Sequence, residues 1–388
     1  MTRSKPVGAM KETALVQALI ALAEEPERRR RDLAAVLSAA PEGVGRLAVD
    51  HGIAGVAYAH ARHLQDHFPD LLAELDAARR QAWINHRTTV ADLSELAPVF
   101  DKLGAPWAVV KGPVLVERAY GRADLRSYYD LDILVEPAAY GDALTALVSE
   151  GAFMIDNNWA LIRSSRRAEL SLCVRDRTIV DLHWHLLNEV SLRRATRWDM
   201  HAVLGRAFTA DVGPARVPVL DPADAVMHLA VHACLAGGHR MVWLKDIERQ
   251  LVKYPVPRDL VEQRAREAGL WPPTDLALTR AEMTFDLAAD GHQAPWTRVN
   301  RWLGTDRFRL SDGFLGNGRT LASATRATVA RSAGAVGAIV ARDQVLPWGR
   351  SRGLGRWLPA PPPSVEDLQR HGGSPRDRQA YLQMVAAQ

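Results

Sequence analysis

The sequence predicts an α+β fold in which a small mixed or antiparallel sheet is flanked by N- and C-terminal helical regions. Apolar residues recur at helical spacing through residues 1–103, and the pattern then changes to strand-like runs between residues 104 and 220. Helical spacing returns over residues 221–303, whereas residues 304–388 are rich in Arg, Gly and Pro. We predict these four segments as the domain organisation, with residues 104–220 as the core.

The composition is that of an ordinary globular protein. Of its 388 residues, 47% are hydrophobic and 24% are charged, and the formal net charge is only +4. Two cysteines, Cys173 and Cys234, make a disulfide framework implausible, so we expect a reducing, cytoplasmic location. No apolar run approaches the roughly 20 residues of a membrane span, and the scattered basic residues give no strong nucleic-acid signature.

The N-terminal region is predicted to be helical throughout. Leu15, Leu19 and Leu22 recur on one helical face. A further helix is predicted over about residues 47–62 and a long one over about residues 70–103.

A continuous apolar run at 107–110 is typical of a strand that is covered on both faces. Lys111-Gly112-Pro113 ends it, and the proline suits the first turn of a helix. We predict that helix over residues 114–120, with Gly121 as its C-cap.

The next strand, residues 129–135, carries two aspartates one residue apart. Successive side chains of a strand point to opposite faces. One face is therefore apolar, with Tyr129, Leu131, Ile133 and Val135. Asp130 and Asp132 lie together on the other face, where paired oxygens suit a hard divalent cation such as magnesium.

A helix opened by Pro137 and closed by Gly151 is predicted next, and its apolar face comprises Ala143, Leu144, Leu147 and Val148. Strand-like pieces follow at 152–156, 169–174 and 178–184, and the last two form an antiparallel hairpin. In the final piece Asp181 shares a face with His183, away from the packing residues.

The remaining chain is predicted to be mainly helical. A short strand pair is expected around 207–219, and Asp221-Pro222 is a good helix start for residues 223–235. Residues 242–252 continue helical, and two or three helices are expected over 258–303. The proline run at 359–363 predicts a loop or an extended segment.

Asp130, Asp132 and Asp181 are the main candidates for chemistry. Three carboxylates on neighbouring strands can bind two metal ions, which suits an in-line displacement on a nucleoside triphosphate. Asp181 would also be placed to take a proton from an acceptor hydroxyl. The competing interpretation is that all three are exposed polar positions of an antiparallel sheet, and the residue pattern alone leaves both open.

Basic residues near the aspartates are candidates for phosphate binding. Lys111 and Gly112 stand between a strand and a helix, where a phosphate can approach the backbone. Arg126 and Lys245 could each reach a phosphate, although either could equally be a surface residue. His183 is a candidate for supporting Asp181 or for contacting the acceptor.

Two further histidines, His228 and His232, have the i, i+4 spacing of a zinc pair on a helix. No glutamate follows His228 in the metalloprotease arrangement. Packing against the sheet is the favoured interpretation.

The run KGPVLVERAYGRADLRSYYDLDILV, followed by VDLHW, resembles the uncharacterised nucleotidyltransferase family of the polymerase-beta superfamily. The likeness rests on Lys111-Gly112, Tyr120, Arg126, Asp130-Leu131-Asp132 and Asp181-Leu182-His183-Trp184, and it extends over most of residues 10–300.

This resemblance implies a minimal mixed sheet with helices on one face, and two magnesium ions, for which manganese could substitute. The implied metal ligands are Asp130, Asp132 and Asp181, and Lys111, Gly112 and Arg126 would handle the triphosphate. The implied reaction moves a nucleoside monophosphate from an NTP to an acceptor and releases pyrophosphate. ATP is favoured as the donor, but no residue selects it, and the acceptor could be a small molecule, a peptide, a protein or a tRNA.

Pro113 departs from the superfamily pattern, in which a serine follows the glycine and helps to hold the triphosphate. Proline has no N–H, so one phosphate donor is missing at this position. Lys111 or a more remote residue would have to replace it.

Two other classes compete with an enzyme. A catalytically inactive nucleotide-sensing protein could keep the same fold, but it would be free to lose carboxylates that are all present here. An RNA-binding helical protein would need a basic groove, whereas the arginines are scattered along the chain.

Overall fold

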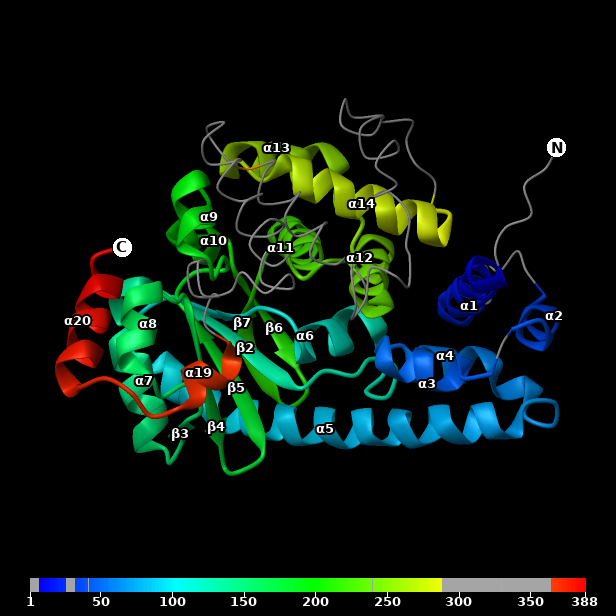
Figure 1. The fold of residues 1–388 in the computed structure, drawn as a ribbon. Helices are drawn as coiled ribbons and strands as arrows, with labels where there is room; N and C mark the ends of the chain where they lie inside the picture. Colours follow the sequence, from blue (N-terminus) through cyan, green and yellow to red (C-terminus); the bar gives the residue numbers. More distant parts are fainter. Residues whose placement is uncertain (1–6, 26–31, 41, 239, 288–328, 330–363) are drawn as a thin grey trace, which may run out of the picture.

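The strands of the chain are β1 (Trp107–Val109), β2 (Asp130–Val135), β3 (Phe153–Met154), β4 (Glu169–Val174), β5 (Thr178–His183), β6 (Phe208–Val212) and β7 (Ala215–Val219). They form one seven-stranded sheet in the order β3-β4-β5-β2-β1-β7-β6 (Figure 1). Pairs β2–β5 and β1–β7 are parallel, and the other neighbours are antiparallel. This computed structural model describes residues 7–25, 32–40, 42–238, 240–287, 329 and 364–388, and only the backbone of residues 7–12. The predicted mixed sheet within an α+β fold is therefore confirmed.

One face of the sheet packs on α5 (Pro69–Asp101), α7 (Tyr140–Ser149), α8 (Trp159–Ser165) and α20 (Pro375–Ala386). Alternation in the strands supplies this core, because Leu131, Ile133 and Val135 all point into it and are at most 1% exposed. Tyr129 was expected to join them, but it precedes the strand and is 70% exposed. On α7, Val148 is likewise exposed rather than buried.

The opposite face of the sheet is also covered. Ala108, Val110 and Leu134 pack with α9 (Val190–Ala195), α10 (Met200–Gly205), α11 (Pro222–Leu235) and α13 (Arg258–Ala268). Figure 1 shows α5 on one side of the sheet and α11 and α13 on the other. The resemblance had implied helices on one face, whereas both faces of this sheet carry a helical layer.

The N-terminal helices share a core with the C-terminal ones. This core joins α1 (Val7–Ala23), α2 (Leu33–Ser38), α3 (Val44–Asp50) and α4 (Ala54–Ala61) to α11, α12 (Met241–Lys253) and α14 (Trp271–Phe285). One helix was expected over residues 47–62, but Gly52, with φ +72°, divides it into α3 and α4. The helical regions on either side of the sheet region in sequence are thus packed together in space.

A buried carboxylate ties α5 to the β4–β5 hairpin. The Asp92 side chain is fully buried, and it accepts hydrogen bonds from Arg175, Arg177 and Thr178. Arg175 and Asp176 both have positive φ, as the tight hairpin turn requires. The sequence predicted this hairpin, and Asp92 fixes its position, and therefore that of β5, on the helix.

The end of the chain returns to the sheet region. Helix α20 lies beside α7 and α8 (Figure 1), and the carbonyl oxygens of α19 (Val365–Gln369) accept hydrogen bonds from Asn157 and Asn158, just before α8. The hydroxyl of Tyr381 in α20 lies 3.2 Å from Nε1 of Trp184, which donates to it. The proline run at 359–363 lies outside the described residues. Of the helices that are described, none is both long enough and apolar enough to cross a membrane.

The remaining short elements are η2 (Arg62–Leu64), α6 (Pro113–Leu115), η3 (Val116–Tyr120) and η4 (Pro137–Ala139). The segment α6–η3 is the helix predicted after Lys111-Gly112, and Gly121 ends it with φ +70°, as expected for a C-cap. The predicted strand pair before α11 is also present, as β6 and β7.

Candidate active site

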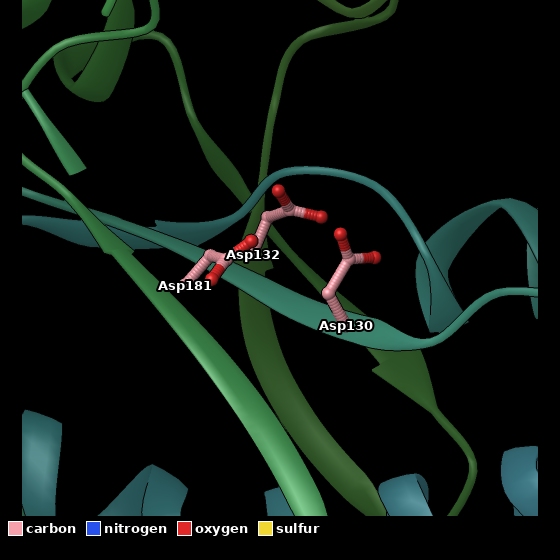
Figure 2. A group of neighbouring side chains, drawn as sticks. All are labelled: Asp130, Asp132 and Asp181. Carbon is pink, nitrogen blue, oxygen red and sulfur yellow. The ribbon is translucent and has the colours of Figure 1, made fainter. Parts of the chain in front are cut away.

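Two parallel strands bring three carboxylates together. Asp132 of β2 is the direct cross-strand partner of Asp181 of β5, and Asp130 lies two residues earlier on β2. Because Leu131 on β2, and Val180 and Leu182 on β5, are buried in the opposite layer, the three aspartates share one face. One oxygen of each carboxylate lies within 4.8 Å of the others (Figure 2). The grouping predicted from the sequence is present in the structure.

Lys111 supplies the nearest positive charge. Its Nζ lies 2.9 Å from Oδ2 of Asp132 and 3.6 Å from Oδ2 of Asp130. The lysine can reach them because the chain turns sharply at Gly112, where φ is +61°. A Cβ atom at Gly112 would lie 3.0 Å from the carbonyl oxygen of Asp130, so a larger residue would push this turn away from the aspartate strand.

The three carboxyl groups differ in acidity. Burial would raise the pKa of Asp132, but Lys111 and His183 outweigh burial and hold that pKa well below its usual range. The negative charge of Asp132 in turn raises the pKa of Asp130, with burial adding to it. Burial, together with the charge of Asp132, raises the pKa of Asp181 to about 6. Charge is therefore concentrated on Asp132, and an added cation would favour ionisation of its two neighbours.

His183 and Ser171 orient the carboxylates from the β4–β5 hairpin. His183 Nε2 lies 3.2 Å from Oδ1 of Asp132, and its Nδ1 lies 3.6 Å from Oε2 of Glu169. Burial lowers the pKa of His183, but the hydrogen bond to Asp132 and nearby carboxylates raise it overall. The Ser171 hydroxyl donates to Oδ1 of Asp181 at 2.6 Å. Sequence reasoning placed His183 beside Asp181, and the structure shows that its closest contact is with Asp132.

Arg126 is held by a buried hydrogen-bonded chain. Its Nε and Nη2 donate to the two carboxylate oxygens of Asp246 in α12, at 2.7 and 2.8 Å. The hydroxyl of Tyr120 donates to Oδ1 of the same aspartate at 2.9 Å. Arg126 and Asp246 are both at least 94% buried, so the guanidinium is fixed in one orientation.

The structure does not bring Lys245 to the carboxylates. Its ammonium contacts Glu25 at 3.0 Å and Glu248 at 2.9 Å. Adjacent residues of a helix point about 100° apart, so Asp246 faces Arg126 while Lys245 faces the N-terminal helices. The nucleotide-binding role predicted for Lys245 gains no support from these contacts, and Asp246 was missed because nothing local identifies its distant partner.

A cleft opens beside Asp130. Its empty volume is about 690 Å³, which includes space that is open to solvent. Its lining includes Lys111, Arg126, Asp130, His232 and Arg240. Burial and the charge of Lys111 lower the pKa of His232 to about 3, so this imidazole is neutral. The cleft therefore offers three basic side chains next to the carboxylate group.

His228 and His232 lie next to each other in α11, with their ring centroids 6.0 Å apart and the ring planes tilted by 41°. Within the described part of the chain, the only group of three or more metal-ligating side chains that converge is Asp130, Asp132 and Asp181. The structure thus gives no third ligand for a zinc site at these histidines. His239, which is close in sequence, lies outside the described residues.

The carboxylate group fits a hard divalent cation. Its three oxygen ligands converge from two strands, and the ammonium of Lys111 already lies between two of them, which shows that the position attracts positive charge. These oxygens would hold the ion. They do not by themselves distinguish magnesium from manganese.

Fold and site together define a mixed α+β protein with an acidic centre beside a basic cleft. The family model described as "Uncharacterised nucleotidyltransferase" matches residues 38–286, which include every strand of the sheet. The chain belongs to this family of nucleotidyltransferases, and membership supports a transferase. A search of curated proteins found no match.

Proposed function

We propose that the protein is a magnesium-dependent nucleotidyltransferase of the polymerase-beta type. It would move a nucleoside monophosphate from an NTP to an acceptor and release pyrophosphate. The observation that carries this proposal is the convergence of Asp130, Asp132 and Asp181 within 4.8 Å, beside a cleft that Asp130 lines together with three basic side chains. Family membership independently supports nucleotidyl transfer.

Each residue has a role that follows from its contacts. Asp130, Asp132 and Asp181 would hold the metal, which when bound neutralises phosphate charge. Lys111 and Arg126 would bind the triphosphate, and Gly112 lets the chain turn close to Asp130. His183 keeps Asp132 in place. Residue roles of this kind suit phosphoryl-type transfer, which depends on positioning and charge neutralisation rather than on a covalent nucleophile.

Asp181 would assist the acceptor. A new bond would form between an acceptor oxygen and the α-phosphorus, the bond to the pyrophosphate oxygen would break, and the acceptor proton would pass to Asp181. Ser171 fixes this carboxylate by its hydrogen bond at 2.6 Å. The acceptor stays open among a small molecule, a peptide, a protein and a tRNA, and ATP stays the favoured donor.

A transfer assay tests the proposal. NTPs labelled at the α-phosphate would be incubated with the protein, magnesium and a lysate of the native host, and labelled products would be separated by size. We expect label in one size class, lost with EDTA and lost in Asp181→Asn. Labelling that persists in full in Asp181→Asn would contradict the assigned role. Magnesium-dependent NTP binding without any transfer would instead favour the nucleotide-sensing alternative.

A further inference from the structure

Two arginines on the wall of the cleft each keep a buried N–H without a hydrogen-bond partner among the described residues. These atoms are Nη1 of Arg126 and Nε of Arg240. Buried polar groups are almost always hydrogen-bonded, so two unsatisfied cationic donors on residues that line one cleft indicate an anionic ligand. Arg126 is only 6% exposed, which makes the unmet donor a property of the folded site rather than of a surface side chain.

The Arg126 donor is fixed in advance. Asp246 takes Nε and Nη2, and this leaves Nη1 as the free end of a rigid, planar guanidinium. The ion pair balances one unit of charge but not the hydrogen-bonding capacity of Nη1. An anion in the cleft would therefore meet a donor whose orientation is already set.

Arg240 lines the same cleft and is the N-cap residue of α12. Its guanidinium carbon lies 5.9 Å from the ring centroid of Trp243. The helix end itself is not the anion site, because its first two N–H groups donate to His51: that of Met241 to Nδ1 and that of Val242 to the carbonyl oxygen. The Arg240 side chain is thus the donor that this end of α12 contributes to the cleft.

The turn after β1 explains why a donor from α12 is needed. Pro113 stands directly after Gly112 and has no N–H, so this loop lacks one backbone donor for a phosphate. Lys111 is already engaged with Asp130 and Asp132. Additional donors for a phosphate must come from the rest of the cleft lining, where Arg126 and Arg240 each have an N–H group without a hydrogen-bond partner among the described residues.

We propose that Arg240, together with Nη1 of Arg126, binds the terminal phosphates of the NTP and replaces the donor that the Gly-Pro turn cannot supply. This inference rests on the proposed function and deepens it. It assigns Arg240 to the triphosphate and leaves the metal to the carboxylates.

The test uses calorimetry on the full-length protein with magnesium and three probes: ATP, AMP and inorganic tripolyphosphate. We expect Arg240→Gln to weaken ATP and tripolyphosphate about tenfold or more, the usual effect of losing a charge-assisted hydrogen bond. Binding of AMP, which lacks the terminal phosphates, should stay unchanged, and Arg240→Lys should restore part of the affinity for ATP. The matched control is Arg46→Gln, since the Arg46 side chain is 72% exposed and, within the part of the chain that the structure describes, pairs only with Asp50 on its own helix.

The outcomes separate this inference from the proposed function. If the wild-type protein binds magnesium-ATP and Arg240→Gln binds it equally well, the role of Arg240 is refuted while the proposed function stands. An equal loss for AMP and ATP would also refute it, because that result indicates general damage to the cleft. If the wild-type protein binds no NTP at all, both proposals fail.

Discussion

Asp132 and Asp181 are direct cross-strand partners in the parallel pair β2 and β5, and they face the same side of the sheet. Parallel neighbours place equivalent residues at one level, so the register itself brings two carboxylates together. Like charges so close repel unless a cation lies between them. The metal-free protein therefore holds this pair under electrostatic strain, which Lys111 and His183 reduce on the Asp132 side.

Replacing Asp181 should stabilise the protein while removing activity. Its pKa is raised from 3.8 to about 6, mainly by burial and by Asp132, so the ionised form is disfavoured in the folded state. The protonated carboxyl therefore contributes to the free energy of unfolding at low pH, and this contribution is lost as the pH rises through about 6. Asp181→Asn cannot ionise and can still accept from Ser171. In EDTA at pH 8 the free energy of unfolding of this variant should exceed that of the wild type by about 2 kcal/mol.

Urea unfolding at two pH values checks whether Asp181→Asn raises the free energy of unfolding. The gain in Asp181→Asn should shrink towards zero near pH 4, where the wild-type carboxyl is largely protonated. A variant less stable than the wild type at pH 8 would show that the surroundings of Asp181 stabilise its ionised form.

Removing the Lys111 ammonium should make the fold depend on metal. Lys111→Met leaves Asp132 and Asp130 without their shared counter-charge, at a cost of about 2–4 kcal/mol in EDTA. Added magnesium should restore more stability in this variant than in the wild type, since a divalent ion takes the place of the ammonium. Thermal unfolding with and without magnesium measures both effects. Lys102→Met, at an exposed site, is the control, and an identical response of the two variants would argue against the charge pairing.

Asp246 should contribute more to the stability of the fold than the number of its hydrogen bonds indicates. Asp246→Asn leaves the buried Arg126 guanidinium uncompensated and turns an amide N–H₂ towards it, so we expect a loss of about 3–5 kcal/mol. Tyr120→Phe removes only one hydrogen bond to the same carboxylate and should cost about 1 kcal/mol. Urea unfolding of the two variants gives the comparison. Similar losses in both would mean that the Arg126–Asp246 pair carries little net charge stabilisation.

The sequence predicts the parts of this site that are local. Period-two alternation places Asp130 and Asp132 on one face of β2, and the same alternation with a tight turn gives the β4–β5 hairpin and the side on which Asp181 lies. The strand–Gly–helix junction likewise positions Lys111. These predictions succeed because each depends on a few neighbouring residues.

Long-range relationships were not predictable from the pattern. Arg126 and Asp246 meet across more than one hundred residues, and no periodicity indicates that pairing. For the same reason the pattern indicated a phosphate contact for Lys245 and did not indicate the role of Asp246 next to it. The division of one expected helix at Gly52 depends on how α3 and α4 pack on α5 and α12, since Val242 lies 3.1 Å from where a Cβ of Gly52 would stand. The Arg126–Asp246 pairing and the helix division at Gly52 depend on tertiary packing rather than on local propensity.

The central claim is that the aspartates bind a nucleotide through a metal ion, and calorimetry of NTP binding with and without magnesium tests it most directly. Titrations of ATP, GTP, CTP and UTP into the wild-type protein should show binding that requires magnesium. Asp130 lines the cleft and its side chain is 35% exposed, so Asp130→Asn should fold normally and lose that requirement together with most of the affinity. Magnesium-dependent binding that is unchanged in Asp130→Asn would contradict the account.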